Sequence, residues 1–198
     1  MSLKASYTFI APLYDLVLER ATRRARALSL RPLASAPAGT VLVAGVGTGL
    51  DLPHLPTVHH YVGLDLTSAM LSRSLPRAAA HRYTPVQGSA MALPFADHQF
   101  DHTVLHLILA VVPDPTQALS EALRVTRPGG RLHVFDKFLR PGQRAVLRRA
   151  LTPLSGRIAT RMDVVLEDLL STRADAIVEH DEPALAGGWF RRVVIRKV

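Results

Sequence analysis

Short apolar runs alternate with segments of helical periodicity along most of this chain. The runs are rich in β-branched residues, as in Val41-Leu42-Val43-Ala44. We expect strands at residues 41–44, 61–65, 84–87, 101–107 and 132–138, and helices at 67 to about 80 and at 115–125. This alternation predicts an α/β fold with a parallel sheet and crossover helices.

The two ends of the chain have different patterns. Apolar residues recur near helical spacing over residues 7–28, with Arg20, Arg23, Arg24 and Arg26 expected on the exposed side and at the C-terminal end. Residues 32–39 then read as a linker, and residues 127–130 as a turn before the fifth strand. Residues 176–180 and 189–198, separated by Gly187-Gly188, predict a closing antiparallel strand pair.

A glycine-rich segment follows the first predicted strand directly. It consists of Gly45, Val46, Gly47, Thr48 and Gly49. Glycine lets the backbone turn sharply and approach a ligand closely, and ligands bind at the carboxyl ends of parallel strands. Since a glycine-rich turn can also be purely structural, this segment alone does not establish a binding site.

An acidic residue at the end of the second predicted strand supports a nucleoside site. Asp65 closes that strand, and a carboxylate there can accept hydrogen bonds from both hydroxyls of a ribose. Pro53 and Pro56 argue against the long helix that would hold a dinucleotide pyrophosphate, and no Gly-Lys-Ser/Thr of a P-loop is present.

The chain resembles the class I S-adenosylmethionine-dependent methyltransferases. The resemblance rests on the glycine loop, GLDLTSAML with Asp65, GSAMALPFADHQFD and LRVTRPGGRL, in the family's order from about residue 40 to 138. AGVGTGLDLPHLP, VVPDP and APLYD look like the bacterial phospholipid N-methyltransferases that act on phosphatidylethanolamine. The quinone C-methyltransferases are similar but less close.

This resemblance implies a Rossmann-like sheet of seven strands, six parallel and one antiparallel, with helices on both faces. The implied cofactor is S-adenosylmethionine, which leaves as S-adenosylhomocysteine. The glycine loop would pass beneath it and Asp65 would hold its ribose. The other implied contacts are Leu66 and Met70 beside the adenine, Ser89, Ala90 and Met91 at its edge, Leu105 and His106 near the methyl group, and Tyr14 as a cover.

One position departs from the family pattern. Relatives usually carry an acid two residues before the first loop glycine, where it helps to hold the cofactor's amino group, and this chain has Val43. Losing a charge-assisted hydrogen bond costs roughly 1.5–3 kcal/mol. Three outcomes stay open: a compensating group, a weaker enzyme, or a catalytically silent cofactor-binding module. Without compensation, Val43→Glu is expected to tighten cofactor binding.

His106 and Tyr14 are the candidate catalytic residues. Methyl transfer needs alignment and desolvation rather than a nucleophilic side chain, but an amine acceptor must lose a proton, and histidine has a suitable pKa. The alternative is that His106 is a neutral, hydrogen-bonded histidine in the pocket wall. Asp136 and Lys137 could border the acceptor. The other histidines lack metal-ligand spacing, and we predict no metal.

The chain's positive charge is concentrated in two segments. The net charge is +8, with six basic and two acidic residues in 1–40 and seven basic and no acidic residues in 137–161. Basic groups beside apolar ones suit an anionic membrane surface, and changing Arg144, Arg148 and Arg149 to Gln should weaken such binding. A solvated surface is the alternative. Nucleic acid is not expected, because no stacking cluster or RNA-binding motif accompanies the charge.

Composition narrows the remaining classes. With 198 residues and no cysteine, the chain excludes a disulfide framework and a Cys nucleophile. Neither a signal peptide nor a membrane-spanning run is evident, which predicts a cytoplasmic protein with peripheral membrane contact at most. We expect a single domain with a helical cover at 1–36, a cofactor-binding core at 40–138, and substrate-side helices with the strand pair at 139–198.

Methyl transfer to a lipid-associated acceptor is therefore the predicted function. A phospholipid headgroup amine is the first choice of acceptor. A quinone ring or another small amphiphile is the alternative within the same chemistry. The sequence predicts neither the oligomeric state nor the pathway.

Overall fold

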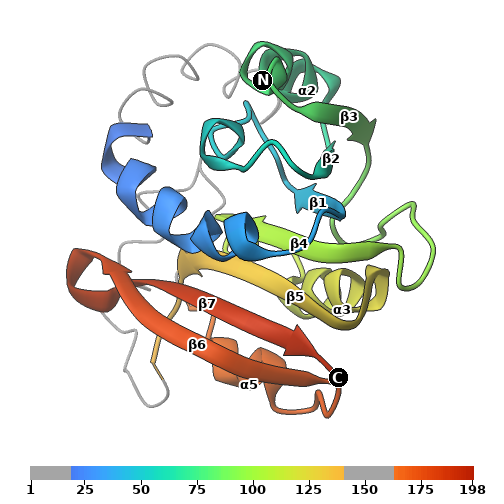
Figure 1. Ribbon diagram of the computed structural model, residues 1–198. Coiled ribbons are helices and arrows are strands. Elements are labelled where there is room, and N and C mark those ends of the chain that lie inside the picture. Colours follow the sequence, from blue (N-terminus) through green and yellow to red (C-terminus); the bar gives the residue numbers. More distant parts are fainter. Residues whose placement is uncertain (1–18, 141–162) are drawn as a thin grey trace, which may run out of the picture.

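Seven strands form one sheet in the computed structural model, which describes residues 19–140 and 163–198. The strand order is β3-β2-β1-β4-β5-β7-β6, from the top to the bottom of Figure 1. The strands are β1 (Thr40–Ala44), β2 (His60–Asp65), β3 (Arg82–Gln87), β4 (Phe100–His106), β5 (Thr126–Lys137), β6 (Ala176–Leu185) and β7 (Phe190–Lys197).

Strand directions confirm the predicted fold. β1 pairs in parallel with β2 and β4, β2 with β3, and β4 with β5. β7 pairs antiparallel with β5 on one side and with β6 on the other, so β6 runs in the same direction as the first five strands. The sheet therefore has six parallel strands and one antiparallel strand, as expected.

The helices agree with the periodicity except where proline or tertiary packing shortens them. α2 (Ser68–Ser74) ends early and continues as the 3-10 turn η3 (Leu75–Ala78), in which Pro76 stands. α3 (Pro115–Val125) has the predicted bounds, and the Asp114 side chain caps it by accepting from Gln117 N at 3.0 Å. The remaining elements are α5 (Leu166–Leu170), η1 (Arg31–Ser35), η2 (Leu52–His54) and η4 (Ala186–Gly188).

Side-chain alternation along the strands gives the sheet two apolar faces. One face packs against α3 and α5 and contains Leu42, Leu105 and Val134. The other contains Val41, Val43 and Val104, and packs against the elements before β1 and between β1 and β3. Because successive side chains of a strand point to opposite faces, Leu105 and His106 lie on different sides of the sheet.

Residues 19–30 form a helix, here called the cover helix, which is blue in Figure 1. Its buried positions recur at helical spacing, at Thr22, Ala25, Arg26, Ser29 and Leu30. Arg20, Arg23 and Arg24 are exposed as expected, but the prediction for Arg26 is wrong: it is buried, 5% exposed. Its burial depends on a partner 25 residues away.

The predicted turn at residues 127–130 lies within β5. Phe100 pairs with Thr126 and His102 with Arg131, so the intervening residues bulge out of the ladder. Gly129 has a φ of +76°, which glycine adopts without strain.

Two predictions lie outside the described residues. These are the contact of Tyr14 with the cofactor and the membrane contact of Arg144, Arg148 and Arg149. Within the described ranges, no helix is long and apolar enough to cross a membrane.

Candidate functional site

The glycine loop follows the carboxyl end of β1 and borders open space at Gly47. Gly45, Gly47 and Gly49 all have positive φ, at 70°, 56° and 83°. A Cβ at Gly45 would lie 2.6 Å from Ile108 Cδ1, whereas a Cβ at Gly47 would have nothing within 4 Å. Gly45 is thus required by close packing, and Gly47 leaves room for a ligand against the backbone. These two features fit the expected passage of the loop beneath S-adenosylmethionine.

Asp65 is fixed between the glycine loop and the residues that follow β2. Its Oδ2 accepts from Gly47 N at 3.0 Å, and its Oδ1 accepts from Thr67 N at 3.0 Å and from Thr67 Oγ1 at 3.2 Å. The residue is only partly buried. A carboxylate has about four lone-pair sites, so acceptor capacity is left for ribose hydroxyls. The ribose contact stays a prediction.

Leu66 and Met70 lie on the turn and the helix that follow Asp65. Leu66 is 65% exposed, and Met70 is partly exposed in the first turn of α2. Covering an exposed apolar side chain such as Leu66 with a flat ring removes apolar surface from water, which is favourable. Both residues are therefore placed where apolar contact with an adenine is possible, as the resemblance implies.

The segment Ser89 to Met91 lies beyond β3, next to the β2 end of the sheet. Ser89 Oγ accepts from Met91 N at 3.2 Å, and Gln117 Nε2 donates to Met91 O at 3.3 Å. Ala90 is buried at 8% exposure. Since a hydroxyl has one hydrogen and two lone pairs, Ser89 keeps a donor and an acceptor site for the predicted adenine edge.

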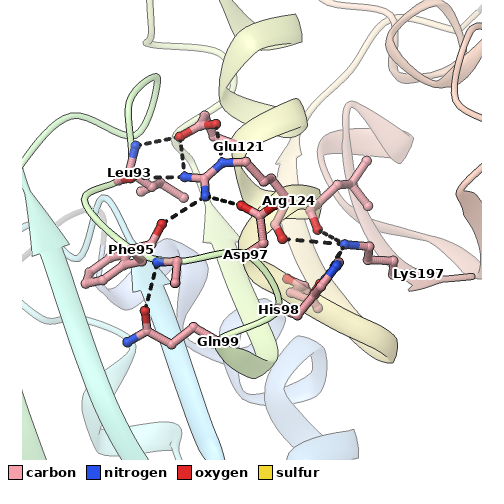
Figure 2. A network of polar contacts seen from close by, with 11 residues as sticks. Leu93, Phe95, Asp97, His98, Gln99, Glu121, Arg124 and Lys197 are labelled. Atoms are coloured by element: carbon pink, nitrogen blue, oxygen red, sulfur yellow. Dashed lines mark hydrogen bonds and ion pairs between the residues drawn. The ribbon is translucent and has the colours of Figure 1, made fainter.

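Arg124 of α3 holds the loop that continues from this segment (Figure 2). Its guanidinium donates to the carbonyl oxygens of Leu93 at 3.1 Å and Phe95 at 2.9 Å, and to Asp97 Oδ1 at 2.7 Å. It also donates to both carboxylate oxygens of Glu121, and Glu121 Oε2 accepts from Leu93 N at 2.7 Å. The planar guanidinium thereby fixes residues 93–97 against α3.

His106 ends β4 in a buried polar network. Its side chain is 1% exposed. Nδ1 lies 2.6 Å from Asp51 Oδ1, and Nε2 lies 3.0 Å from Ser29 Oγ. Because an ionised carboxylate only accepts hydrogen bonds, we assign the hydrogen to Nδ1. The next residue, Leu107, has a φ of +57° and turns the chain away from the strand.

Asp51 and Arg26 complete this network, and sequence reasoning missed both. Arg26 Nη1 donates to Asp51 Oδ1 at 2.7 Å, and Arg26 Nε donates to Thr22 Oγ1 at 2.9 Å. The side chains of Arg26 and Asp51 are 6% and 5% exposed. The available signal was an acid two residues after Gly49, in a loop that otherwise consists of leucines, prolines and His54. The cover helix is thus joined to the glycine loop and to β4.

The charge of Asp51 depends on this network. Burial by itself would raise its pKa, but the hydrogen bonds from His106 and Arg26, together with the charge of the Arg26 guanidinium, hold the pKa well below its ordinary value. Asp51 is therefore ionised at neutral pH, and the Arg26–Asp51 pair is close to neutral overall.

Asp136 and Lys137 end β5, beside the end of β4. Asp136 is fully buried and accepts from Ala110 N at 3.1 Å and from Lys137 N at 2.8 Å. Burial raises the pKa of Asp136 to about 6, against the lowering effect of these backbone donors. Burial also lowers the pKa of Lys137. That these two residues border the acceptor stays a prediction.

Three buried histidines lie nearer the amino ends of the strands. The ring centroids of His59 and His102 are 6.3 Å apart, and those of His102 and His133 are 5.4 Å apart. Burial lowers the pKa of His102 to about 4 and that of His133 to about 3. In the described ranges, no group of three or more His, Asp or Glu residues is arranged to hold a metal ion.

Sequence comparisons connect this site with known enzymes. A methyltransferase-domain family model matches residues 42–134. The chain is 32% identical over 161 residues to a phosphatidylethanolamine N-methyltransferase of Cereibacter sphaeroides, covering 79% of each protein. It is 37% identical over 137 residues to a demethylmenaquinone methyltransferase of Renibacterium salmoninarum, covering 67% of this chain and 57% of the relative.

Solved structures of low sequence identity share the fold. A SAM-dependent methyltransferase of Thermotoga maritima superposes with a TM-score of 0.72 at 19% identity, over 100% of both chains. A chain from a complex that contains the Haloferax volcanii Trm112 methyltransferase activator gives a TM-score of 0.76 at 16% identity, over 96% of both chains. With the sheet order, the glycine loop and the sequence matches, we conclude that the chain belongs to the class I S-adenosylmethionine-dependent methyltransferases.

Proposed function

We propose that this enzyme methylates a phospholipid headgroup amine at an anionic membrane surface. The observation that carries the proposal is the 32% identity, over 79% of both chains, with a phosphatidylethanolamine N-methyltransferase. The amine of such a headgroup lies at the membrane surface, so the enzyme must place its site against that surface.

The cover helix has the two faces that this task needs. Its outer face carries the exposed residues Arg20, Arg23 and Arg24, and no described residue forms a salt bridge with them. Its inner face carries Arg26 and Ser29, which reach Asp51 and His106. Each basic group near an anionic surface contributes about 1 kcal/mol. Binding through the outer face would bring the site close to the lipid headgroups.

The residues around His106 could manage the proton of the acceptor. S-adenosylmethionine, when bound, supplies a methyl group activated on a sulfonium. A headgroup ammonium must first lose a proton, and His106 is the proposed acceptor of that proton. Asp51 holds Nδ1–H and so leaves the Nε2 lone pair toward Ser29 Oγ, 3.0 Å away. In this proposal Ser29 passes the amine proton to Nε2, while the cover helix and the predicted cover residue Tyr14 exclude water.

Labelled-methyl transfer to defined vesicles tests the acceptor. Vesicles contain phosphatidylglycerol with either phosphatidylethanolamine or phosphatidylcholine, and the lipids are separated after incubation with labelled S-adenosylmethionine. We expect label in the phosphatidylethanolamine sample alone. An enzyme that binds S-adenosylhomocysteine but leaves this lipid unlabelled would refute the proposal.

Sedimentation with the same vesicles tests the membrane surface separately. Changing Arg20, Arg23 and Arg24 together to Gln should weaken binding to anionic vesicles, and added salt should do the same. Arg82, exposed on the distant edge strand β3, gives the matched control Arg82→Gln. If the triple variant and Arg82→Gln bind anionic vesicles equally well, the cover helix does not contact the membrane.

Quinone methylation is the second candidate. The 37% identity with a demethylmenaquinone methyltransferase favours it, although that match covers 57% of the relative. A carbon acceptor on a quinol ring is also amphiphilic and membrane-bound. Demethylmenaquinol in the same vesicles, tested beside phosphatidylethanolamine, distinguishes the two acceptors by which one takes the label.

A further inference from the structure

The Arg26 guanidinium and the Asp51 carboxylate each have one atom that forms no hydrogen bond with a described residue. Both hydrogen bonds to the Asp51 carboxylate, from Arg26 Nη1 and His106 Nδ1, end on Oδ1. Arg26 donates through Nε and Nη1. In the part of the chain that the structure describes, nothing donates to Asp51 Oδ2 and nothing accepts from Arg26 Nη2. Asp51 Oδ2 and Arg26 Nη2 are therefore available to a ligand.

The Arg26–Asp51 pair lies near the expected place of the cofactor's amino-acid end. The predicted contacts of Asp65, Leu66 and the Ser89 to Met91 segment would put the nucleoside at the β2 and β3 ends of the sheet. On the other side of β1 lies β4, which ends at His106. Asp51 comes from the glycine loop and touches His106, so the pair lies where the amino-acid end would extend from the ribose.

The chemistry of the pair matches that end. The amino-acid part of S-adenosylmethionine is a zwitterion with one ammonium and one carboxylate. A lone carboxylate would attract the first and repel the second, whereas a nearly neutral Arg–Asp pair offers a partner to each. Val43 lies on the same face of the sheet as His106 and carries no charge. Asp51 thus supplies, from the loop, a carboxylate that the first strand lacks.

We infer that Arg26 and Asp51 clamp the zwitterionic amino-acid end of the cofactor. Asp51 Oδ2 accepts from the ammonium, and Arg26 Nη2 donates to the carboxylate. Both are binding residues, positioned by Thr22 through Arg26 Nε and by His106 through Asp51 Oδ1. The clamp serves any methyl acceptor, so it does not depend on the proposed lipid.

Calorimetric titration with four ligands tests the clamp without an activity measurement. The ligands are S-adenosylhomocysteine, its analogue without the amino group, its analogue without the carboxylate, and 5′-methylthioadenosine, which lacks both. The unchanged protein should bind S-adenosylhomocysteine about tenfold or more tightly than either single-deletion analogue. Equal affinity for S-adenosylhomocysteine and 5′-methylthioadenosine would overturn the clamp, and this arm needs no variant.

Two variants assign the groups. Asp51→Asn should weaken S-adenosylhomocysteine about tenfold and leave the analogue without the amino group within about twofold. Arg26→Gln should likewise weaken S-adenosylhomocysteine about tenfold and leave the analogue without the carboxylate within about twofold. Asp65→Asn is the matched control, because it should weaken all four ligands alike.

Affinity ratios within one variant are independent of how much of it is folded, so a partly unfolded variant still gives a result. A loss shared equally by all four ligands in Asp51→Asn and Arg26→Gln would make the pair purely structural and refute the inference. None of the ligands contains a methyl acceptor. A failed clamp therefore leaves the lipid proposal standing, and a failed lipid assay leaves the clamp standing.

Discussion

Asp65 joins two chain segments through Gly47 N and Thr67, and its remaining lone pairs are the predicted acceptors of the ribose hydroxyls. We predict that Asp65→Ala weakens S-adenosylhomocysteine binding about tenfold or more, since one or two charge-assisted hydrogen bonds are lost. Calorimetry measures the affinity, and thermal unfolding checks that the variant is folded. Unchanged affinity in a folded variant would remove Asp65 from the site.

Val43 shows how the structure changes an expectation drawn from the sequence. Its side chain is 1% exposed and packs with Leu30 and Val104. Burying a polar group there without a partner costs about 1–3 kcal/mol or more. Because Asp51 already supplies a carboxylate on this face, Val43→Glu should lower the melting temperature without tightening S-adenosylhomocysteine binding.

The variant Val43→Gln is the control for Val43→Glu, since it has similar bulk and no charge. Both should lose stability to a comparable degree at low pH, where the glutamate is protonated. If Val43→Glu instead binds S-adenosylhomocysteine about tenfold more tightly than Val43→Gln, the missing acid is uncompensated and Asp51 does not replace it.

At the scale of elements, α3 controls the loop after β3. Arg124 binds the carbonyl oxygens of Leu93 and Phe95, and Glu121 accepts from Leu93 N. Arg124→Gln should release residues 93–97, increase hydrogen exchange at the Leu93 amide, and weaken S-adenosylhomocysteine binding several-fold, because the adjoining Ser89 to Met91 segment is less well ordered.

Arg127→Gln is the matched control for this loop. This substitution removes the same charge, but Arg127 pairs with Asp101 at 2.7 Å and does not contact residues 93–97. Its effect on Leu93 exchange should be negligible. Equal exchange at Leu93 in Arg124→Gln and in the unchanged protein would show that the loop holds its shape without the guanidinium.

For the whole molecule, buried titratable groups predict how stability depends on pH. His102 and His133 have pKa values lowered to about 4 and about 3, while the unfolded value is 6.5. Below pH 6.5 the unfolded chain therefore binds two protons that the folded chain does not. Asp136 opposes this, because its folded pKa of about 6 exceeds the unfolded 3.8. For these three groups, the net uptake on unfolding between about pH 4 and 6 is one proton.

The free energy of unfolding should therefore fall by about 1.4 kcal/mol for each unit that the pH falls between about 4 and 6. His133→Leu removes one of the two histidines and should make this slope smaller by about 1.4 kcal/mol per pH unit. Urea unfolding at several pH values measures it. His180→Leu, at an exposed position of β6, is the control and should keep the slope. The same slope in both variants would contradict the assignment.

Local patterns in the sequence determined the strands, the glycine loop and the position of Asp65. An apolar run of five residues or a glycine after a strand reports on its own backbone, so no distant partner is needed to interpret it. The closing pair β6 and β7 was predictable for the same reason, since Gly187-Gly188 separates two strand-like runs.

Only the tertiary structure decided which polar residues meet. Arg26 lies 25 residues from Asp51, and Asp51 lies 55 residues from His106. Periodicity puts Arg26 on a helix, but an arginine is ordinarily exposed, and its burial becomes stable only with a carboxylate from a distant segment. Arg124 and the loop at 93–97 follow the same logic. Contacts of this kind depend on how the elements pack, which no local pattern contains.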